Sequence, residues 1–159
     1  MNPARPSALL CLVLTGSISA DEAEELRKLG AGVFTTAGQV TEINLNRSKI
    51  TDAQLKLVAV FPKLTDLSLE QTKVTGKGLA HLTRLAKLEW VNLFQTQVDD
   101  DGLAHLAKLK SLQQLPIGKT KVTDAGLVHV AKIKHLKYLG LRGNKSPTPV
   151  FHVWLSCRN

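Results

Sequence analysis

"LEWVNLFQTQVDDDGLAHLAKLKSL", residues 88–112, is the stretch that decides the fold. It places Trp90 and Phe94 two positions either side of Asn92, with a leucine or valine in every gap. Such alternation has the period of two that a short β-strand shows. Only 4% of the chain is aromatic. Two large rings on the polar side of one strand therefore need an explanation from the surrounding sequence.

The chain aligns with itself at a fixed period of 24, and a constant period of this size indicates a solenoid or array. Within one unit, Leu67 and Leu69 flank a polar residue, which is the period of a strand. Leu79, Leu82 and Leu85 then fall three apart, on one face of a helical turn. Each unit is therefore predicted to be strand, turn and helix, and the chain holds four full units and a divergent fifth. The units end at equivalent leucines, Leu64, Leu88, Leu112 and Leu136.

Side chains that can accept hydrogen bonds from a first helical turn recur at each predicted helix start. They are Thr51, Thr75, Asp99 and Thr123. Aspartates, which favour the positive end of a helix dipole, follow three of them: Asp52, Asp100 and Asp124. The triple aspartate at 99–101 is accordingly interpreted as a cap with solvated carboxylates, and not as a metal site.

The pattern LxxLxLxxTxVTDxGLxxLxxLxxL resembles the leucine-rich-repeat family, in particular the 24-residue T-D-x-G-L subtype common in exported proteins of planctomycete-like bacteria. The resemblance implies an α/β fold similar to that of ribonuclease inhibitor. In this fold a right-handed superhelix has a parallel sheet on its concave face and helices on its convex face. Where many repeats of this family carry Asn, side chains here are expected to hydrogen-bond between neighbouring turns. These are Ser48, Thr72, Thr96, Thr120 and Asn144.

Three regions are predicted along the chain. Residues 1–20, with an early Arg5, an apolar run and small residues at the end, have the order of a secretory signal cleaved after Ala20. A buried strand or a disordered extension is the alternative. With a signal the protein is expected to be exported, and otherwise cytoplasmic. Residues 21–39 are predicted to form an N-terminal cap of helix plus extended segment, and residues 40–159 the repeat domain.

The repeat pattern fails from Lys145 onward, yet Phe151, Trp154 and Cys157 keep the register of the helix leucines. The tail is interpreted as a degenerate last turn that closes the core, and a truncated or frame-shifted end is the alternative. No apolar run in the sequence reaches the roughly 18 residues that a membrane-spanning helix needs.

No residue pattern indicates catalysis or a cofactor, so the chain is not expected to be an enzyme. His81, His105 and His129 recur at the same period as the leucines. Equivalent positions on stacked helices lie about 10 Å apart, whereas zinc holds its nitrogen ligands at about 2.0–2.1 Å. The three histidines are therefore interpreted as half-exposed repeat positions and not as metal ligands.

The first predicted binding surface is the concave side of the sheet. Because the strand leucines point into the core, the residues between them must face outward, and small residues such as Pro116 and Gly118 beside large rings should leave a hollow. Aromatic and arginine side chains within a polar rim are typical of protein-recognition hot spots. An alternative is that the rings fold flat over each other to shield the sheet. The predicted partner-binding residues are Asp66, Glu70, Trp90, Asn92, Phe94, Gln114, Tyr138 and Arg142.

The second predicted surface is a lysine file at one edge of the sheet, one position after the Ser/Thr/Asn position in four of the five units; the remaining unit has Gln97 there. Its members are Lys49, Lys73, Lys121 and Lys145. The formal net charge of +8 suits an acidic polysaccharide or a lipid headgroup held mainly by charge. Nucleic acid is the least favoured polyanion, because an exported protein would seldom meet it.

The sequence thus favours a non-enzymatic recognition module that binds a protein partner through the concave face. Two alternatives stay open: a structural fragment of a longer repeat protein, and a polyanion binder that uses the lysine file. The residues do not identify the ligand or the partner.

Overall fold

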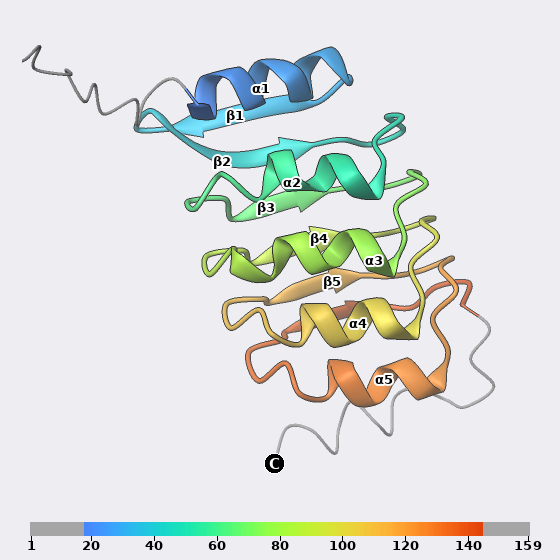
Figure 1. The fold of residues 1–159 in the computed structure, drawn as a ribbon. Coiled ribbons are helices and arrows are strands. Elements are labelled where there is room, and N and C mark those ends of the chain that lie inside the picture. The colour runs from blue at the N-terminus through green and yellow to red at the C-terminus, as the bar shows by residue number, and fades with distance from the viewer. Residues whose placement is uncertain (1–17, 145–159) are drawn as a thin grey trace, which may run out of the picture.

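A six-stranded sheet, ordered β1-β2-β3-β4-β5-β6, runs the length of the computed structural model, which describes residues 18–144 (Figure 1). β1 and β2 are antiparallel, and every later pair is parallel. The strands are β1 Gly32–Thr36, β2 Gln39–Asn44, β3 Asp66–Ser68, β4 Trp90–Asn92, β5 Gln114–Pro116 and β6 Tyr138–Gly140.

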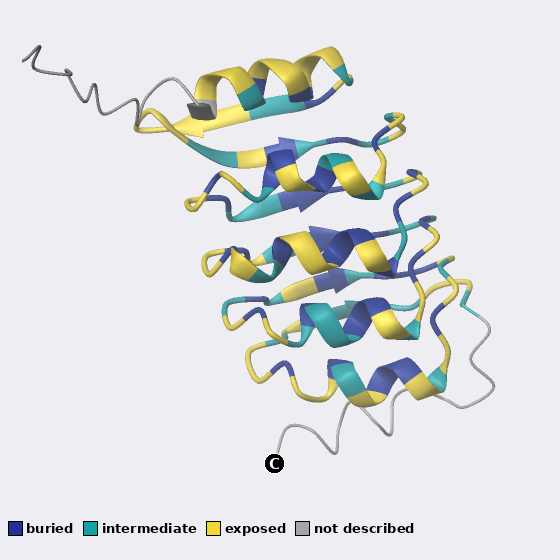
Figure 2. Cartoon of the chain, viewed as in Figure 1, coloured by how far each residue is buried: buried dark blue, intermediate teal, exposed yellow. Residues whose placement is uncertain are grey.

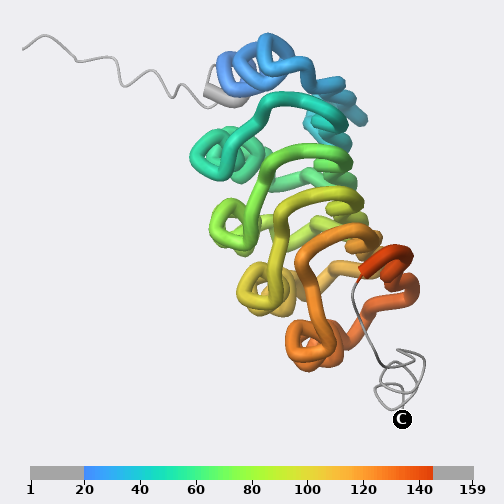
Figure 3. Tube along the Cα trace, turned by 90° about the vertical axis from the view of Figure 1, so that its right-hand side faces the viewer, coloured from blue at the N-terminus to red at the C-terminus, as the bar shows by residue number. Residues whose placement is uncertain are grey.

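The helices stack against one face of this sheet, one coil below the next (Figures 1 and 3). They are α1 Ile18–Lys28, η1 Asp52–Gln54, α2 Leu55–Val58, α3 Gly76–Leu79, η2 Ala80–Arg84, α4 Asp100–Leu106 and α5 Asp124–Val130. Strand, turn and helix alternate in each of the four coils from β2 to α5, so the predicted α/β solenoid with a parallel sheet is confirmed. We call the sheet face that points away from the helices the open face; it is the face that the sequence predicts to be concave.

The core lies between the sheet and the helices, and the residues with a period of 24 fill it (Figure 2). Leu67 and Leu69 from a strand and Leu79 and Leu82 from the following helix are each 0% exposed. The repeat thus buries the same positions in the successive coils from β2 to α5, and no coil could bury them alone.

The predicted caps are present at the helix starts. The side chains of Thr75 and Thr123 accept a hydrogen bond from the backbone N–H two residues later, at 3.3 Å in each case. Asp99 Oδ1 accepts from the backbone N–H of Gly102 at 3.2 Å. At Thr51 the roles differ, because its own N–H donates to Oε1 of Gln54 at 2.9 Å. Each arrangement pairs a backbone group that the first turn leaves without a helical partner.

Two of the aspartates that follow these caps also tie neighbouring coils together. Asp52 Oδ1 accepts from the N–H of Thr75 at 2.8 Å, and its Oδ2 accepts from the Thr75 hydroxyl at 2.6 Å. Asp100 makes the same pair of bonds to Thr123, at 2.8 and 2.7 Å. The sequence predicted only a favourable helix-dipole position for these side chains.

The Asp–Thr link is absent at the junction between these two, because both of its residues are replaced. The position of the threonine is taken by Asp99, and the position of the aspartate one coil earlier is taken by Gly76. A Cβ atom added to Gly76 would collide with the Asp99 carboxylate and lie 2.7 Å from the Cα of Gly102. An aspartate there would also set two like charges against each other. The glycine therefore accommodates the acidic cap.

We expect Asp100→Ala to lower the free energy of unfolding by about 1–2 kcal/mol. It removes a charged acceptor from two hydrogen bonds and leaves the N–H of Thr123 without that partner. Urea unfolding followed by circular dichroism measures the effect. The matched control is Asp101→Ala, an exposed acid in the same first turn of α4. Equal losses in the two variants would show that helix-dipole charge, and not the link between coils, is responsible.

The predicted hydrogen bonds between turns from the Ser/Thr/Asn position are wrong for the threonines. The hydroxyls of Thr72, Thr96 and Thr120 donate to the carbonyl three residues earlier in their own coil, at 2.7–2.8 Å. Asn144 does bridge coils, because its longer side chain accepts from the N–H of Thr120 at 3.0 Å and donates to the carbonyl of Ile117 at 2.9 Å. A hydroxyl on Cβ is too short to make both contacts.

Helix α1 and the β1–β2 hairpin lie over the N-terminal end of the stack (Figure 1). Leu26 of α1 is 0% exposed and Ala23 is 5% exposed, so this helix shields the first coil. The helix begins at Ile18 and runs through the cleavage position expected at Ala20. The rest of the expected signal and the tail from Lys145 lie outside the described residues. Within residues 18–144, no helix combines the length and apolar character needed to cross a membrane.

Candidate functional site

Strand register places the outward-facing side chains in three rows across the open face. Residues paired on neighbouring strands point to the same side of a sheet, and the pairs Asp66–Trp90, Trp90–Gln114 and Gln114–Tyr138 define the first row. The second row lies two residues later in each strand and includes Asn92. The third row lies two residues further, just past the strand ends, and includes Glu70, Phe94 and Arg142. The eight predicted partner-binding residues all belong to these rows.

The hairpin extends the first row beyond the repeats. Glu42 pairs with Asp66 across β2 and β3, and Phe34 pairs with Glu42 across β1 and β2. Phe34 is 53% exposed and Tyr138, at the far end of the row, is 54% exposed. The row therefore reads Phe34, Glu42, Asp66, Trp90, Gln114 and Tyr138. Phe34 and Glu42 were not among the predicted partner-binding residues; a shift of one repeat back from Asp66 identifies Glu42.

A chain of hydrogen bonds fixes the middle of the open face. Asn46 Oδ1 accepts from the Ser68 hydroxyl at 2.6 Å and from the N–H of Glu70 at 3.0 Å. The Asn92 amide then donates to Oε2 of Glu70 at 3.2 Å, and its Oδ1 accepts from the N–H of Phe94 at 3.0 Å. Side chains bonded in this way are held in one orientation, which lowers the entropy lost when a partner binds.

Asn92 was predicted to contact a partner, and it is the one buried residue among the eight predicted. It is only 8% exposed and both ends of its amide are engaged. Its side chain therefore holds Glu70 and the backbone of Phe94, and contributes little surface of its own. The physical reason is that both polar atoms of this short side chain are already paired, one with the preceding coil and one with its own backbone.

Trp90 and Phe94 are both half-buried on the open face. The ring of Phe94 covers Gly118 so closely that a Cβ atom added there would lie 3.0 Å from Cδ2 and 3.1 Å from Cε2. The Nζ of Lys119 lies above the same ring, 5.5 Å from its centroid. The hollow predicted beside the large rings is therefore filled at Gly118 by Phe94 itself, because a side chain without a partner folds onto the nearest open surface.

The sheet ladder is interrupted next to these rings. Between β4 and β5 the register holds the single pair Trp90–Gln114, whereas β3 and β4 share three pairs. Pro116 lies in β5 and has no N–H to donate. Its carbonyl still accepts from the N–H of Leu93 at 2.8 Å, so the strands stay in register.

Charges divide the open face along the solenoid. Glu42, Asp66 and Glu70 lie toward the N-terminal end, whereas Arg142 is exposed near the C-terminal end. The Asp66 carboxylate accepts from the Thr65 hydroxyl at 2.6 Å. Within the described part of the chain, no ion pair neutralises any of these four groups.

The predicted lysine file lies on the edge where strands lead into helices. Lys49, Lys73 and Lys121 are exposed there, and Lys145 lies outside the described residues. Carboxylates share this edge: Asp52 follows Lys49, Asp124 follows Lys121, and the aspartates at 99–101 lie in the coil between, where Gln97 takes the place of a lysine. The file is therefore part of a surface of mixed charge.

The repeat histidines differ in exposure: His81 is exposed, and His105 and His129 are half-buried. Among residues 18–144, no group of three or more His, Cys, Asp or Glu side chains could hold a metal ion. Neither finding adds chemistry to the open face.

Comparisons with known proteins give structural relatives only. No protein-family model matches the sequence, and no curated protein is significantly similar to it. The fold is similar to that of internalin C2 from Listeria monocytogenes, with 27% identity and a TM-score of 0.55 over 68% of this chain and 43% of that one. It is also similar to the leucine-rich-repeat ectodomain of the plant receptor kinase GASSHO1/SCHENGEN3 from Arabidopsis thaliana, with 20% identity and a TM-score of 0.55 over 72% of this chain and 14% of that one.

The fold is a leucine-rich-repeat solenoid. A third similar structure, Pollen Receptor Kinase 3, agrees with this at 16% identity and a TM-score of 0.52, over 72% of this chain and 56% of that one. The leucine-rich-repeat solenoid described here thus spans less than two thirds of the length of each of these three proteins.

Proposed function

We propose that the chain is a non-enzymatic recognition module that binds a protein partner through the open face. One observation carries the proposal: Phe34, Trp90 and Tyr138 stand in a single row on a rigid sheet, with polar residues between them. Aromatic anchors within a polar rim dominate the binding energy of protein interfaces. Preorganised anchors also lose little freedom on binding.

Burial supports this assignment. Across the described residues, the large apolar side chains that stay exposed are Phe34, Val60, Val128 and Tyr138, and the two aromatic ones both lie in this row. They stand at the two ends of the row, and the half-buried Trp90 lies between them. The leucine-rich-repeat ectodomain from Arabidopsis was solved in complex with CASPARIAN STRIP INTEGRITY FACTOR 2, which is compatible with a binding role for this fold.

We further propose that the repeats belong to the 24-residue T-D-x-G-L subtype and that the protein is exported. The repeated Thr/Asp caps and the glycines at 78, 102 and 126 support the subtype. The order of charge, apolar run and small residues in residues 1–20 supports export.

The test is capture of partners from the cell envelope of the source organism by the full chain and by Trp90→Ala/Phe94→Ala. We expect the double variant to weaken binding of a captured partner by about 2 kcal/mol or more, as truncation of hot spots does. A matched double variant, Val60→Ala/Val128→Ala, removes exposed apolar side chains outside the open face and should bind like the wild type. Titration calorimetry with the purified partner measures both.

Thermal unfolding of the same variants separates recognition from packing. Phe94 covers Gly118, so a small loss of stability is expected in the double variant, while the buried leucines keep the fold intact. Unchanged affinity in a folded Trp90→Ala/Phe94→Ala variant would overturn the proposal for these two rings.

A further inference from the structure

Most of the net charge of the protein is carried by one edge of the solenoid. The four loops that lead from a helix into the next strand include equivalent segments at 60–65, 84–89, 108–113 and 132–137. Together they contain eight Lys or Arg residues and one acid, Glu89, for a formal net charge of +7, compared with +8 for the whole chain. The basic residues are Lys63, Arg84, Lys87, Lys108, Lys110, Lys132, Lys134 and Lys137. We call these residues the basic edge.

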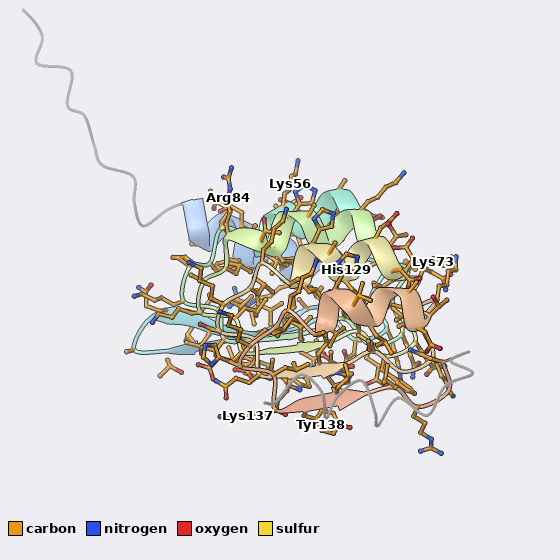
Figure 4. The ribbon with its side chains drawn as sticks, turned by 90° about the horizontal axis from the view of Figure 1, so that it is seen from below. Lys56, Lys73, Arg84, His129, Lys137 and Tyr138 are labelled. Atoms are coloured by element: carbon orange, nitrogen blue, oxygen red, sulfur yellow. The ribbon has the colours of Figure 1, made fainter. Side chains whose placement is uncertain are left out.

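The fold stacks these loops one under another. In Figure 1 they lie along the left side, between the end of each helix and the start of the next strand. All eight basic side chains are exposed, and none forms an ion pair with a carboxylate among the described residues. Figure 4 shows Arg84 toward the helices and Lys137 toward the sheet, which mark the two sides of this edge. The single acid, Glu89, accepts a hydrogen bond from the Gln113 amide at 3.0 Å.

The charge of the basic edge rises along the solenoid. The segments at 60–65 and 84–89 each carry a net charge of +1, the segment at 108–113 carries +2, and the segment at 132–137 carries +3. Equivalent groups in adjacent coils stand about 5 Å apart near the sheet and about 8–10 Å apart near the helices. These separations are comparable to one Debye length at physiological ionic strength, about 8 Å. The potentials of the groups therefore add, which makes a continuous positive track.

We propose that the basic edge binds a linear anionic polysaccharide that lies along the solenoid axis, with its carboxylate or sulfate groups beside successive coils. This site is distinct from the open face and from the lysine file. The opposite edge is a weaker candidate for a polyanion, because the capping aspartates lie among Lys49, Lys73 and Lys121. Like-charged carboxylates there would repel the ligand.

The side chains of the basic edge favour a polysaccharide over nucleic acid or a membrane. Single-stranded nucleic acid is usually held by aromatic stacking as well as charge. The one Phe, Trp or Tyr residue in these segments, Phe61, is buried, and His135 is their one exposed aromatic ring. Stable membrane attachment generally needs a second signal besides basic residues. Val60, 39% exposed, is the only large exposed apolar side chain of the described loops. Seven lysines and one arginine form a row of point charges, which suits a flexible ligand held by charge.

The experiment measures binding of the full chain to fluorescently labelled dextran sulfate and polygalacturonate by anisotropy over a range of salt concentrations. The test variant is Lys108→Gln/Lys110→Gln/Lys132→Gln/Lys134→Gln. The matched control is Lys49→Gln/Lys73→Gln/Lys77→Gln/Lys121→Gln, which removes the same four charges from exposed lysines of the opposite edge. All eight side chains are exposed, so melting temperatures close to wild type confirm that both variants fold.

We expect the test variant to lose at least about tenfold in affinity, with a slope of log K against log salt that is shallower by about three. The control should change by less than about threefold. Binding to one polymer only identifies sulfate or carboxylate as the recognised group. Equal losses in both variants would mean that affinity follows net charge alone and would overturn the site. Failure of the wild type to bind either polymer, or tighter binding to phosphatidylserine vesicles or single-stranded DNA, would overturn the ligand class.

Discussion

Replacing Leu103 with alanine should lower the free energy of unfolding by about 2–5 kcal/mol. Leu103 lies in α4, is 0% exposed, and belongs to the central coil of the stack. The substitution removes buried apolar atoms and leaves a cavity that coils on both sides prevent from closing, and both effects cost stability. Because each coil is stabilised by its neighbours, a defect in the centre weakens two contacts between coils. Chemical unfolding followed by circular dichroism measures the loss.

The control for this prediction is Val128→Ala in α5, which removes apolar atoms from a side chain that is 56% exposed. Substitutions at such surface positions usually change stability by no more than about 0.5 kcal/mol. A Leu103→Ala variant that unfolds at the same denaturant concentration as Val128→Ala would show that the register of the helices is wrong.

Gly102→Ala should destabilise the fold by about 3 kcal/mol, although alanine is the better helix former by roughly 1 kcal/mol. A Cβ atom at residue 102 would lie 2.6 Å from the Cα of Gly76 and 3.0 Å from Cγ1 of Val98. The first of these contacts is with backbone, which cannot rotate away as a side chain does. Relief requires α3 and α4 to separate, and overpacking of this kind typically costs about 1–3 kcal/mol.

Gly140→Ala provides the comparison, because its added Cβ would meet mainly the flexible ring of Tyr138, at 3.2 Å from the hydroxyl oxygen. We expect this variant to unfold close to wild type. If the midpoint of thermal unfolding for Gly102→Ala were equal to or above that of Gly140→Ala, the close approach of α3 and α4 would be refuted.

The fold was predictable from sequence because each coil repeats two periodicities in the same order. Positions such as Leu69 and Leu79 recur at a fixed spacing, so their burial in one coil predicts burial in its neighbours; at the last described strand the equivalent leucines, Leu139 and Leu141, are only partly buried. The glycines at 78 and 102 recur at the same spacing, and both would collide with the preceding coil if they carried a Cβ atom. Periodicity identifies such positions because identical contacts are made at each step of the stack.

The open face was predictable only in part. The rows that contain Trp90 and Phe94 follow from strand alternation, which needs no knowledge of tertiary contacts. Phe34 was missed because the hairpin precedes the repeats and has no equivalent in the coils that follow. The sequence carries one local indication of the hairpin, Gly38 in its turn. Ala37 and Gly38 both have positive φ, 51° and 74°, as a two-residue hairpin turn of this type requires.

Side-chain orientation was the least predictable property. Whether Phe94 stands away from the sheet or lies over Gly118 depends on a choice of rotamer that the spacing of residues does not determine. The threonine hydroxyls are a second case. Thr72 and Thr96 bond the carbonyl three residues earlier in their own coil, and the spacing of the repeats does not distinguish this bond from one to the next coil.

The links between coils restrict how the number of repeats can change during evolution. Asp52 faces Thr75 and Asp100 faces Thr123, while Gly76 faces Asp99 in the coil between them. Loss of the single unit that begins at Thr75 would bring Asp52 opposite Asp99, so that two carboxylates would meet where a hydroxyl now donates. Loss of two consecutive units would bring Asp52 opposite Thr123 and restore the link. The array can therefore gain or lose coils without disturbing these links only in pairs. A pair of coils is twice the period that the leucines show.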